Sequence, residues 1–267
     1  MSETRALPIA GRSVTLPEVI EVRSPYDDRL LGAVPACTAA EVDEAVAAAK
    51  AALATPIPAH ERARILDAVA DALEKRAEEF AQTICGEAAK PIRTARIEVA
   101  RAVETFRFAA VEARSLTGEV VPMDAHPAGT GKFGFTLRVP VGVIGAISPF
   151  NFPLNLVAHK LAPAIAADCP VVLKPASQTP LTAILLAETI HAAGLPPERL
   201  SVVTGGGGTV GKGAAHHYVF DATTAFDLDC AHQGARQRRV LTPPQLRFFI
   251  VVQRDVLDKK AVFIHGL

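Results

Sequence analysis

The sequence predicts an α/β fold in which a parallel βαβαβ sheet carries an N-terminal helical layer and a protruding β-hairpin. Three observations support this prediction. Before residue 117 most apolar residues recur at helical spacing. From Val139 onward, short apolar strands alternate with helices, which implies a parallel sheet covered on both faces. Between the two parts, a Gly- and Pro-rich turn region leads into residues 133–139, which alternate as a strand does.

The N-terminal part begins with a second predicted hairpin over residues 19–35, where apolar and polar residues alternate around an Asp-Asp turn. Thr38 and Glu41 form a capping box, which predicts a helix from there to about Ala54. A second helix is predicted to carry one apolar stripe, formed by Ile65, Leu66, Val69, Leu73, Phe80 and Ile84. A third is expected from about Pro91 to Leu116, with apolar positions at Ile97, Val103, Phe106 and Phe108.

The parallel sheet is predicted to contain three strands, in the stretches VGVIGAIS, PVVLKP and RLSVVTG. The helix after the first strand follows Pro153, a residue suited to a first helical turn. The helix after the second strand has Thr179 as its cap, Pro180 at its first position and Gly194 just past its end. Residues 212–267 show no useful periodicity, so we expect a domain over residues 1–211 followed by a disordered tail.

Composition excludes several classes of protein. The 267 residues are 49% hydrophobic and 21% charged, with 28 basic and 28 acidic side chains, so nothing favours nucleic acid or an anionic membrane as partner. No apolar run reaches the roughly 18 residues that span a bilayer, and the N-terminus lacks the apolar core of a signal peptide. We therefore expect a cytoplasmic protein whose scattered cysteines, at 37, 85, 169 and 230, are reduced thiols.

Two polar side chains stand where open α/β sheets bind their ligands. Asn151, in the stretch ISPFNFP, follows the first parallel strand, and Lys174 ends the second. Alone, Asn151 could be an ordinary helix cap and Lys174 a solvated lysine. Because adjacent strands deliver both residues to one edge, the joint functional interpretation is stronger than either part.

The glycine-rich stretch at residues 206–213 fits two motifs imperfectly. Gly206, Gly208 and Gly211 satisfy G-x-G-x-x-G, but they follow the third strand and not the first. The stretch also nearly matches a phosphate-binding P-loop, yet Gly213 replaces the hydroxyl that would ligate Mg²⁺. A flexible glycine turn remains the simpler interpretation. His216, His217, Cys230 and His232 match no known zinc-ligand spacing, so no metal site is expected.

Taken together, residues 138–167 and 171–206 resemble the aldehyde dehydrogenase superfamily, because Pro-Phe-Asn-Phe-Pro and Lys-Pro-Ala-Ser fall at that family's separation. The resemblance covers roughly residues 15–211. It implies a partial, Rossmann-like aldehyde dehydrogenase fold with a bridging β segment at about residues 117–140. It also implies NAD or NADP as cofactor, a small aldehyde as substrate, and a homo-oligomer joined through the hairpin.

The resemblance assigns roles residue by residue. Asn151 would offer its amide to the oxyanion that forms when a cysteine thiolate attacks the aldehyde. Lys174 would hydrogen-bond the adenosine ribose. The remaining expected cofactor contacts are Ile147, Ser148, Pro149, Phe150, Ala176, Ser177, Gly208 and Gly211.

Departures from the family pattern limit what this chain is expected to do. Ser177 stands where many NAD-preferring members carry glutamate, and Asp168-Cys169 replaces a Gly-Asn turn. After Gly211 the general-base and nucleophile motifs are missing, and Cys230 has the wrong neighbours. The sequence therefore predicts an NAD(P)-dependent aldehyde dehydrogenase truncated before its catalytic domain and inactive alone.

Two other function classes remain open. The chain could be a non-catalytic interaction module that pairs with full-length subunits through its hairpin. A P-loop nucleotide hydrolase is the weakest alternative, since the motif fails at its metal ligand.

Overall fold

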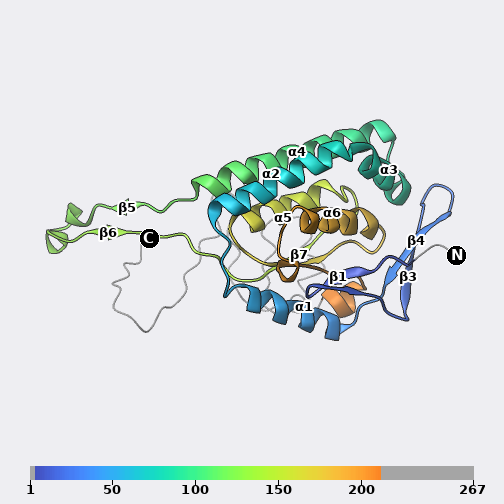
Figure 1. Ribbon diagram of the computed structural model, residues 1–267, viewed down its shortest axis with the longest axis horizontal. Helices are drawn as coiled ribbons and strands as arrows, with labels where there is room; N and C mark the ends of the chain where they lie inside the picture. The colour runs from blue at the N-terminus through green and yellow to red at the C-terminus, as the bar shows by residue number, and fades with distance from the viewer. Residues whose placement is uncertain (1–3, 212–267) are drawn as a thin grey trace.

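The structure is a computed structural model that describes residues 4–211. The predicted tail, with His216, His217, Cys230 and His232, lies outside the described residues. Figure 1 shows a layered α/β body from which one thin arm projects. Within the described range, no helix is both long and apolar enough to cross a membrane.

A three-stranded parallel sheet lies at the centre of the body. Its strands are β7 (Ile144–Ile147), β8 (Val171–Lys174) and β9 (Leu200–Val202), hydrogen-bonded in the order β7-β8-β9. Both pairings are parallel, with Ile144 opposite Val171 and Val171 opposite Leu200. The helices α5 (Asn155–Ala166) and α6 (Pro180–Ala192) connect the strands. The predicted parallel βαβαβ arrangement is therefore confirmed.

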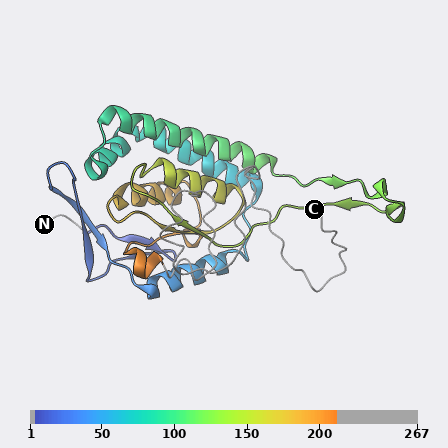
Figure 2. The ribbon, with the colours of Figure 1, turned by 180° about the vertical axis from the view of Figure 1, so that it is seen from behind.

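The layers are built differently from the sequence prediction. On one face of the sheet lies α1 (Ala39–Ala52), which contacts β8 and β9, and on the other lie α5 and α6. The helices α2 (Ala59–Lys75), α3 (Ala77–Ala88) and α4 (Ile92–Ser115) pack mainly on one another, and this layer covers α5 and α6. Most of the N-terminal helical layer thus contacts the crossover helices and not the sheet itself (Figures 1 and 2).

The single helix predicted around Ile65 to Ile84 is wrong, because two helices meet at Arg76. Arg76 leaves the helical conformation at φ −103° and ψ 19°, ending α2 and preceding α3. Its guanidinium is held by Glu79 and by the Thr189 hydroxyl at 2.8 Å. All six residues of the predicted stripe are nevertheless buried. The apolar stripe continues across the bend, which is why periodicity alone did not reveal it.

The long helix α4 exposes a few large apolar side chains among its charged ones. Val103 and Phe106 are buried, but Ile97 and Phe108 are exposed, by 57% and 70% of their surface. Their positions face away from α2, α3 and α5, against which the buried side of α4 packs.

Two hairpins lie beside the sheet. The predicted hairpin of residues 19–35 is confirmed as β3 (Val19–Arg23) paired antiparallel with β4 (Leu30–Pro35). The sequence did not predict the other, β1 (Leu7–Ile9) with β2 (Arg12–Val14). Its turn residues Ala10 and Gly11 have φ of 50° and 77°, the left-handed conformation that tight hairpin turns require.

The projecting arm contains β5 (Val120–Val121) and β6 (Gly134–Phe135), paired antiparallel. Two short 3₁₀ turns join them, η1 (Met123–Ala125) and η2 (Pro127–Gly129). The strand predicted over residues 133–139 is thus much shorter than expected. Phe133 and Leu137 are 77% and 72% exposed, so no second layer supports a longer ladder here.

Capping explains the helix ends only in part. The capping box of Thr38 and Glu41 at α1 is confirmed. Helix α6 begins at Pro180 as predicted, and Gly194, with φ +107°, follows its end. However, the Thr179 hydroxyl makes no cap hydrogen bond. The buried Glu87 carboxylate replaces it and accepts from the N–H groups of Leu181 and Thr182 at 2.8 and 2.9 Å.

Candidate functional site

The carboxyl ends of the three parallel strands bring three loops to one edge of the sheet. Ile147 lies beside Lys174 in the β7–β8 register, and the Ser148 N–H donates to the Lys174 carbonyl at 3.1 Å. The third loop, residues 205–211, follows β9 and includes the π-helical turn η4 (Gly207–Gly211). This edge is where open α/β sheets bind ligands.

The loop after β7 presents both apolar and polar groups to solvent. Ile147 and Phe150 are 39% and 57% exposed, Ser148 is buried, Pro149 is half-buried, and Asn151 is exposed. Helix α5 runs from Asn155, and the Leu156 N–H donates to the Phe152 carbonyl at 3.1 Å, so Pro153 lies in the turn that leads into the helix.

A buried carboxylate explains the late start of α5. The Oε1 atom of Glu98 accepts from the N–H groups of Leu154 and Asn155 at 2.9 and 3.1 Å. Its Oε2 atom lies 2.6 Å from the Lys90 ammonium. Negative charge at a helix N-terminus satisfies unpaired N–H groups and complements the helix dipole. The first turn of α5 is therefore fixed by α4.

Lys90 contacts the Asn151 loop directly. Its Nζ donates to the Asn151 carbonyl oxygen at 2.7 Å and lies 4.0 Å from the centre of the Phe152 ring. With the bond to Glu98, the ammonium group makes three directed contacts, as many as it has protons. Sequence reasoning missed both residues, although a charged Glu98 among the buried Ala95, Val99 and Ala102 was an available signal.

Lys174 is almost fully buried at the end of β8, with 7% of its surface exposed. Burial lowers the pKa of its ammonium group. Its Nζ donates to the Pro175 carbonyl at 3.3 Å. The next residues, Ala176 and Ser177, are half-buried, and the Ser177 hydroxyl donates to the Gly205 carbonyl at 3.2 Å. The loops after β8 and β9 are thereby tied together.

The glycine turn leaves open space at this edge. Cβ atoms built on Gly207 or Gly208 would meet nothing within 4 Å, whereas one on Gly211 would lie 4.0 Å from Lys174 Cε. Gly211 and Lys174 are therefore neighbours, although 37 positions separate them in the numbering of the sequence. Lys212 and Gly213, on which the P-loop alternative depends, lie outside the described residues.

Other reactive groups in residues 4–211 do not form a site of their own. No cluster of three His, Cys, Asp or Glu side chains in this range could hold a metal ion. Cys37, Cys85 and Cys169 are free thiols, as expected, and burial raises the pKa of each.

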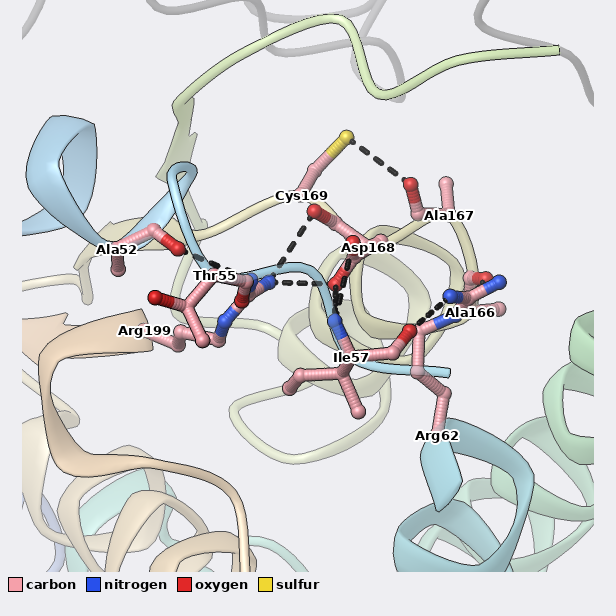
Figure 3. Close-up of polar contacts among 9 residues, drawn as sticks. All are labelled: Ala52, Thr55, Ile57, Arg62, Ala166, Ala167, Asp168, Cys169 and Arg199. Atoms are coloured by element: carbon pink, nitrogen blue, oxygen red, sulfur yellow. Dashed lines mark hydrogen bonds and ion pairs between the residues drawn. The ribbon is translucent and has the colours of Figure 1, made fainter. Parts of the chain in front are cut away.

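A polar network at the amino end of β8 is structural (Figure 3). Arg199 Nη1 pairs with Asp168 Oδ1 at 2.6 Å, and both side chains are buried. The second guanidinium nitrogen donates to the carbonyls of Ala52 and Thr55. The Ile57 N–H donates to the Asp168 carboxylate. This network joins the segment after α1 to the turn before β8, at the edge opposite the candidate site.

Comparisons with known proteins agree on one family. A model of the Aldehyde dehydrogenase family matches residues 13–225. The 3-sulfolactaldehyde dehydrogenase of Priestia aryabhattai is 44% identical over 204 residues, which are 76% of this chain and 43% of that protein. The aspartate-semialdehyde dehydrogenase 1 of Pseudomonas canavaninivorans is 42% identical over 70% of this chain and 40% of its own length.

Solved structures give the same result. The NADP-dependent glyceraldehyde-3-phosphate dehydrogenase from Bacillus halodurans C-125, complexed with NADP, matches with a TM-score of 0.78 at 38% identity. The match covers 82% of this chain and 47% of that one. PnpE in complex with nicotinamide adenine dinucleotide matches with a TM-score of 0.75 at 37% identity, over 79% and 43% of the two chains. These likenesses confirm the α/β class, and the chain spans less than half the length of each of these relatives.

Proposed function

The chain belongs to the aldehyde dehydrogenase family, and we propose that residues 1–211 form the dinucleotide-binding part of an NAD(P)-dependent enzyme that oxidises an aldehyde to a carboxylic acid. One observation carries this proposal. Three strand ends converge at one sheet edge, where Lys174 neighbours Gly211 and the Asn151 loop follows the adjacent strand. Residues 212–267 would form a separate segment.

The residues at this edge suit a dinucleotide. Lys174 offers a positive donor, which can bind ribose hydroxyls or a phosphate. Gly207 and Gly208 leave open space beside it, so a ligand can approach the backbone closely. The other proposed contacts are Ile147, Ser148, Pro149, Phe150, Ala176, Ser177, Gly208 and Gly211. When bound, NAD or NADP would accept the hydride that the aldehyde loses.

Asn151 is the proposed stabiliser of developing negative charge. A carboxamide N–H donor held rigidly before reaction stabilises an oxyanion, and removal of one such donor typically costs ~10²–10³ in rate. Support comes from the contacts on both sides of the residue: Lys90 holds its carbonyl, and Glu98 holds the helix start that follows.

We assign the nucleophile of this chemistry to none of the cysteines of residues 4–211. A thiolate must be available near neutral pH, but burial raises the pKa of the Cys37, Cys85 and Cys169 thiols. The described part would therefore supply cofactor binding and charge stabilisation, and the nucleophile and base would have to come from elsewhere. An assay of NAD(P)H formation with small aldehydes, in wild type and in Cys230→Ala, tests this. Turnover that the substitution abolishes would make Cys230 the nucleophile.

Ser177 should permit binding of NADP. The side chain is small and neutral, so it does not repel the 2′-phosphate, and the nearby Lys174 can donate to it. We expect NADP to bind at least as tightly as NAD. Replacing Ser177 with Glu should weaken NADP about 10–100-fold more than NAD through like-charge repulsion.

The matched control is Ser177→Gln, because a glutamine side chain is nearly the same size as glutamate but carries no charge. It also removes the hydroxyl that donates to Gly205, so any loss caused by bulk or by that hydrogen bond should appear for both cofactors. Calorimetric titrations at fixed salt would measure how much each of the two variants weakens the binding of NAD and of NADP relative to wild type. Equal weakening of NAD and NADP by Ser177→Glu would contradict the assignment of Ser177 to the 2′ position.

A second candidate function, a subunit-pairing module, is favoured by the projecting arm. Apolar side chains on it are exposed by 58–77%, namely Val120, Phe133, Phe135 and Leu137. Exposed apolar surface of this kind commonly marks a protein interface. Light scattering after size exclusion should show an oligomer that Phe133→Ser with Leu137→Ser converts to monomer. A wild-type monomer at all accessible concentrations would exclude self-association through the arm.

A further inference from the structure

Lys90 and Glu98 contact the Asn151 loop on both sides, and they come from a different layer of the fold. Lys90 lies in the turn between α3 and α4, and Glu98 lies further along α4. Only 13% of the Lys90 side chain and none of the Glu98 side chain is exposed. We propose that the two are positioning residues that hold residues 151–155 in the geometry Asn151 needs to donate to an oxyanion. The inference rests on the proposed role of Asn151.

The contacts of Lys90 constrain the peptide next to the functional side chain. Its Nζ donates to the Asn151 carbonyl at 2.7 Å and lies 4.0 Å from the Phe152 ring centre. The carbonyl of Asn151 and the N–H of Phe152 belong to one planar peptide unit. A bond to that carbonyl and a contact with the next ring therefore restrict the orientation of this plane, and with it the position of the Asn151 Cα.

Glu98 constrains the other end of the loop. Its Oε1 accepts from the Leu154 and Asn155 N–H groups, which fixes where α5 begins. Its Oε2 receives the Lys90 ammonium at 2.6 Å, so one carboxylate links both anchors. Hydrogen bonds to charged groups are the stronger kind, and burial reduces their screening by salt.

The turn that carries Lys90 is itself unusual. Ala89 ends α3 with φ 48° and ψ 32°, a left-handed conformation that residues other than glycine seldom adopt. Pro91, with φ −54°, then precedes α4. A left-handed residue on one side and proline on the other leave the Lys90 backbone little freedom. The lysine is thus presented from a defined position, as a positioning role requires.

The alternative is that Lys90 only neutralises Glu98, a buried charge that would otherwise be costly. The two roles separate in the variants Lys90→Met and Lys90→Met/Glu98→Gln. The single change leaves Glu98 without its cation, which could prevent folding. The double change removes both charges, and glutamine can still accept from Leu154 and Asn155. If charge balance were the whole role, the double variant would restore the loop as well as the fold.

Two measurements decide between these roles without any catalytic turnover. Hydrogen exchange of the Leu154 and Asn155 amides reports the helix start, and ¹⁵N relaxation of Asn151 and Phe152 reports the loop. In Lys90→Met we expect the amides to exchange about 10–100-fold faster, since the Glu98 carboxylate that accepts from them loses the ammonium group that holds it in place. Backbone order parameters of Asn151 and Phe152 should fall from about 0.85 to below about 0.6.

Two further variants, together with the double variant, make the test specific. Lys90→Arg keeps a buried donor cation and should restore most of the order. The double variant should recover global stability and slow exchange but leave Asn151 and Phe152 disordered. Lys75→Met, which removes an exposed lysine at the end of α2, should change neither measurement. NAD(P) titrations run in parallel test the proposed function separately from the positioning role. A wild-type chain that binds no cofactor would refute the proposed function but would leave the role of Lys90 and Glu98 untouched.

Two results would overturn the proposal. One is an unchanged order parameter for Asn151 and Phe152 in both the single and the double variant. The other is full recovery of loop order in the double variant, which would reduce Lys90 to charge compensation for Glu98.

Discussion

Replacing Arg199 with Met should lower the free energy of unfolding by about 3–5 kcal/mol. The substitution leaves the Asp168 carboxylate buried without its cation, and breaking such a pair typically costs this much. Their atoms are 2.6 Å apart, and the two side chains are only 4% and 8% exposed. Arg199 also loses its bonds to the carbonyls of Ala52 and Thr55, where the chain leaves α1.

The expected loss is large compared with the total stability of a domain, which is about 5–15 kcal/mol. It corresponds to a fall in melting temperature of roughly 6–20 °C for a chain of this size. Urea denaturation followed by circular dichroism measures the free energy directly, provided that the slope with denaturant stays constant between variants. The matched control is Arg114→Met, which breaks the exposed pair with Asp67 and should cost less than about 1 kcal/mol.

A double variant separates charge from hydrogen bonding. Asp168 has φ +61°, a conformation that asparagine tolerates well, so Asp168→Asn removes charge with little backbone strain. Arg199→Met/Asp168→Asn should recover part of the loss, because position 168 then carries no buried negative charge. If Arg199→Met costs no more than Arg114→Met, the reasoning from burial is refuted. If the double variant recovers none of the lost free energy of unfolding, that loss comes from the hydrogen bonds of Arg199 to Ala52 and Thr55.

Two further predictions concern the elements around the candidate site. Burial raises the pKa of Glu87 from 4.5 to about 7, so its contribution to stability is present below pH 4.5 and is lost as the pH rises through 7. Between pH 4.5 and 8 the free energy of unfolding of wild type should therefore fall by about 3 kcal/mol more than that of Glu87→Gln, as measured by urea denaturation. Free energies that change with pH in the same way in both proteins would contradict this. Gly205→Ala should destabilise by more than about 1 kcal/mol, because φ is +154° and the new Cβ would lie 2.5 Å from Val210 Cγ2. Gly207→Ala, where a Cβ meets open space, should stay within about 0.5 kcal/mol, and equal effects at both glycines would refute the steric argument.

The elements that the sequence predicted well are those whose signals are local. The capping box at Thr38 and Glu41 involves residues three apart, and Pro180 and Gly194 mark the two ends of one helix. A short apolar strand between two helices can likewise be recognised from its own residues and their immediate neighbours. For the same reason the sheet edge that carries Lys174 could be located before the structure was known.

What the sequence could not predict depends on contacts between distant segments. Arg76 bends the chain where its guanidinium reaches Thr189, which is 113 residues away. Glu87 caps a helix that begins more than ninety residues later, and periodicity gave no sign of its partner. Phe108 lies outside the core because its helix packs through another side, and only the helix–helix contacts reveal which side that is.

Both crossover helices begin where a buried glutamate from the outer helical layer accepts their first N–H groups. Glu98 does this for α5 and Glu87 for α6. The loop after β7, which carries Asn151, and the loop after β8, which begins next to Lys174, each end at one of these helix starts. The outer layer therefore fixes the far end of two site loops, although most of it does not touch the sheet. The two caps differ in charge balance, because Glu98 is paired with Lys90 while burial raises the pKa of Glu87 to about 7. A fall in pH from 8 to 6 should consequently protonate the α6 cap.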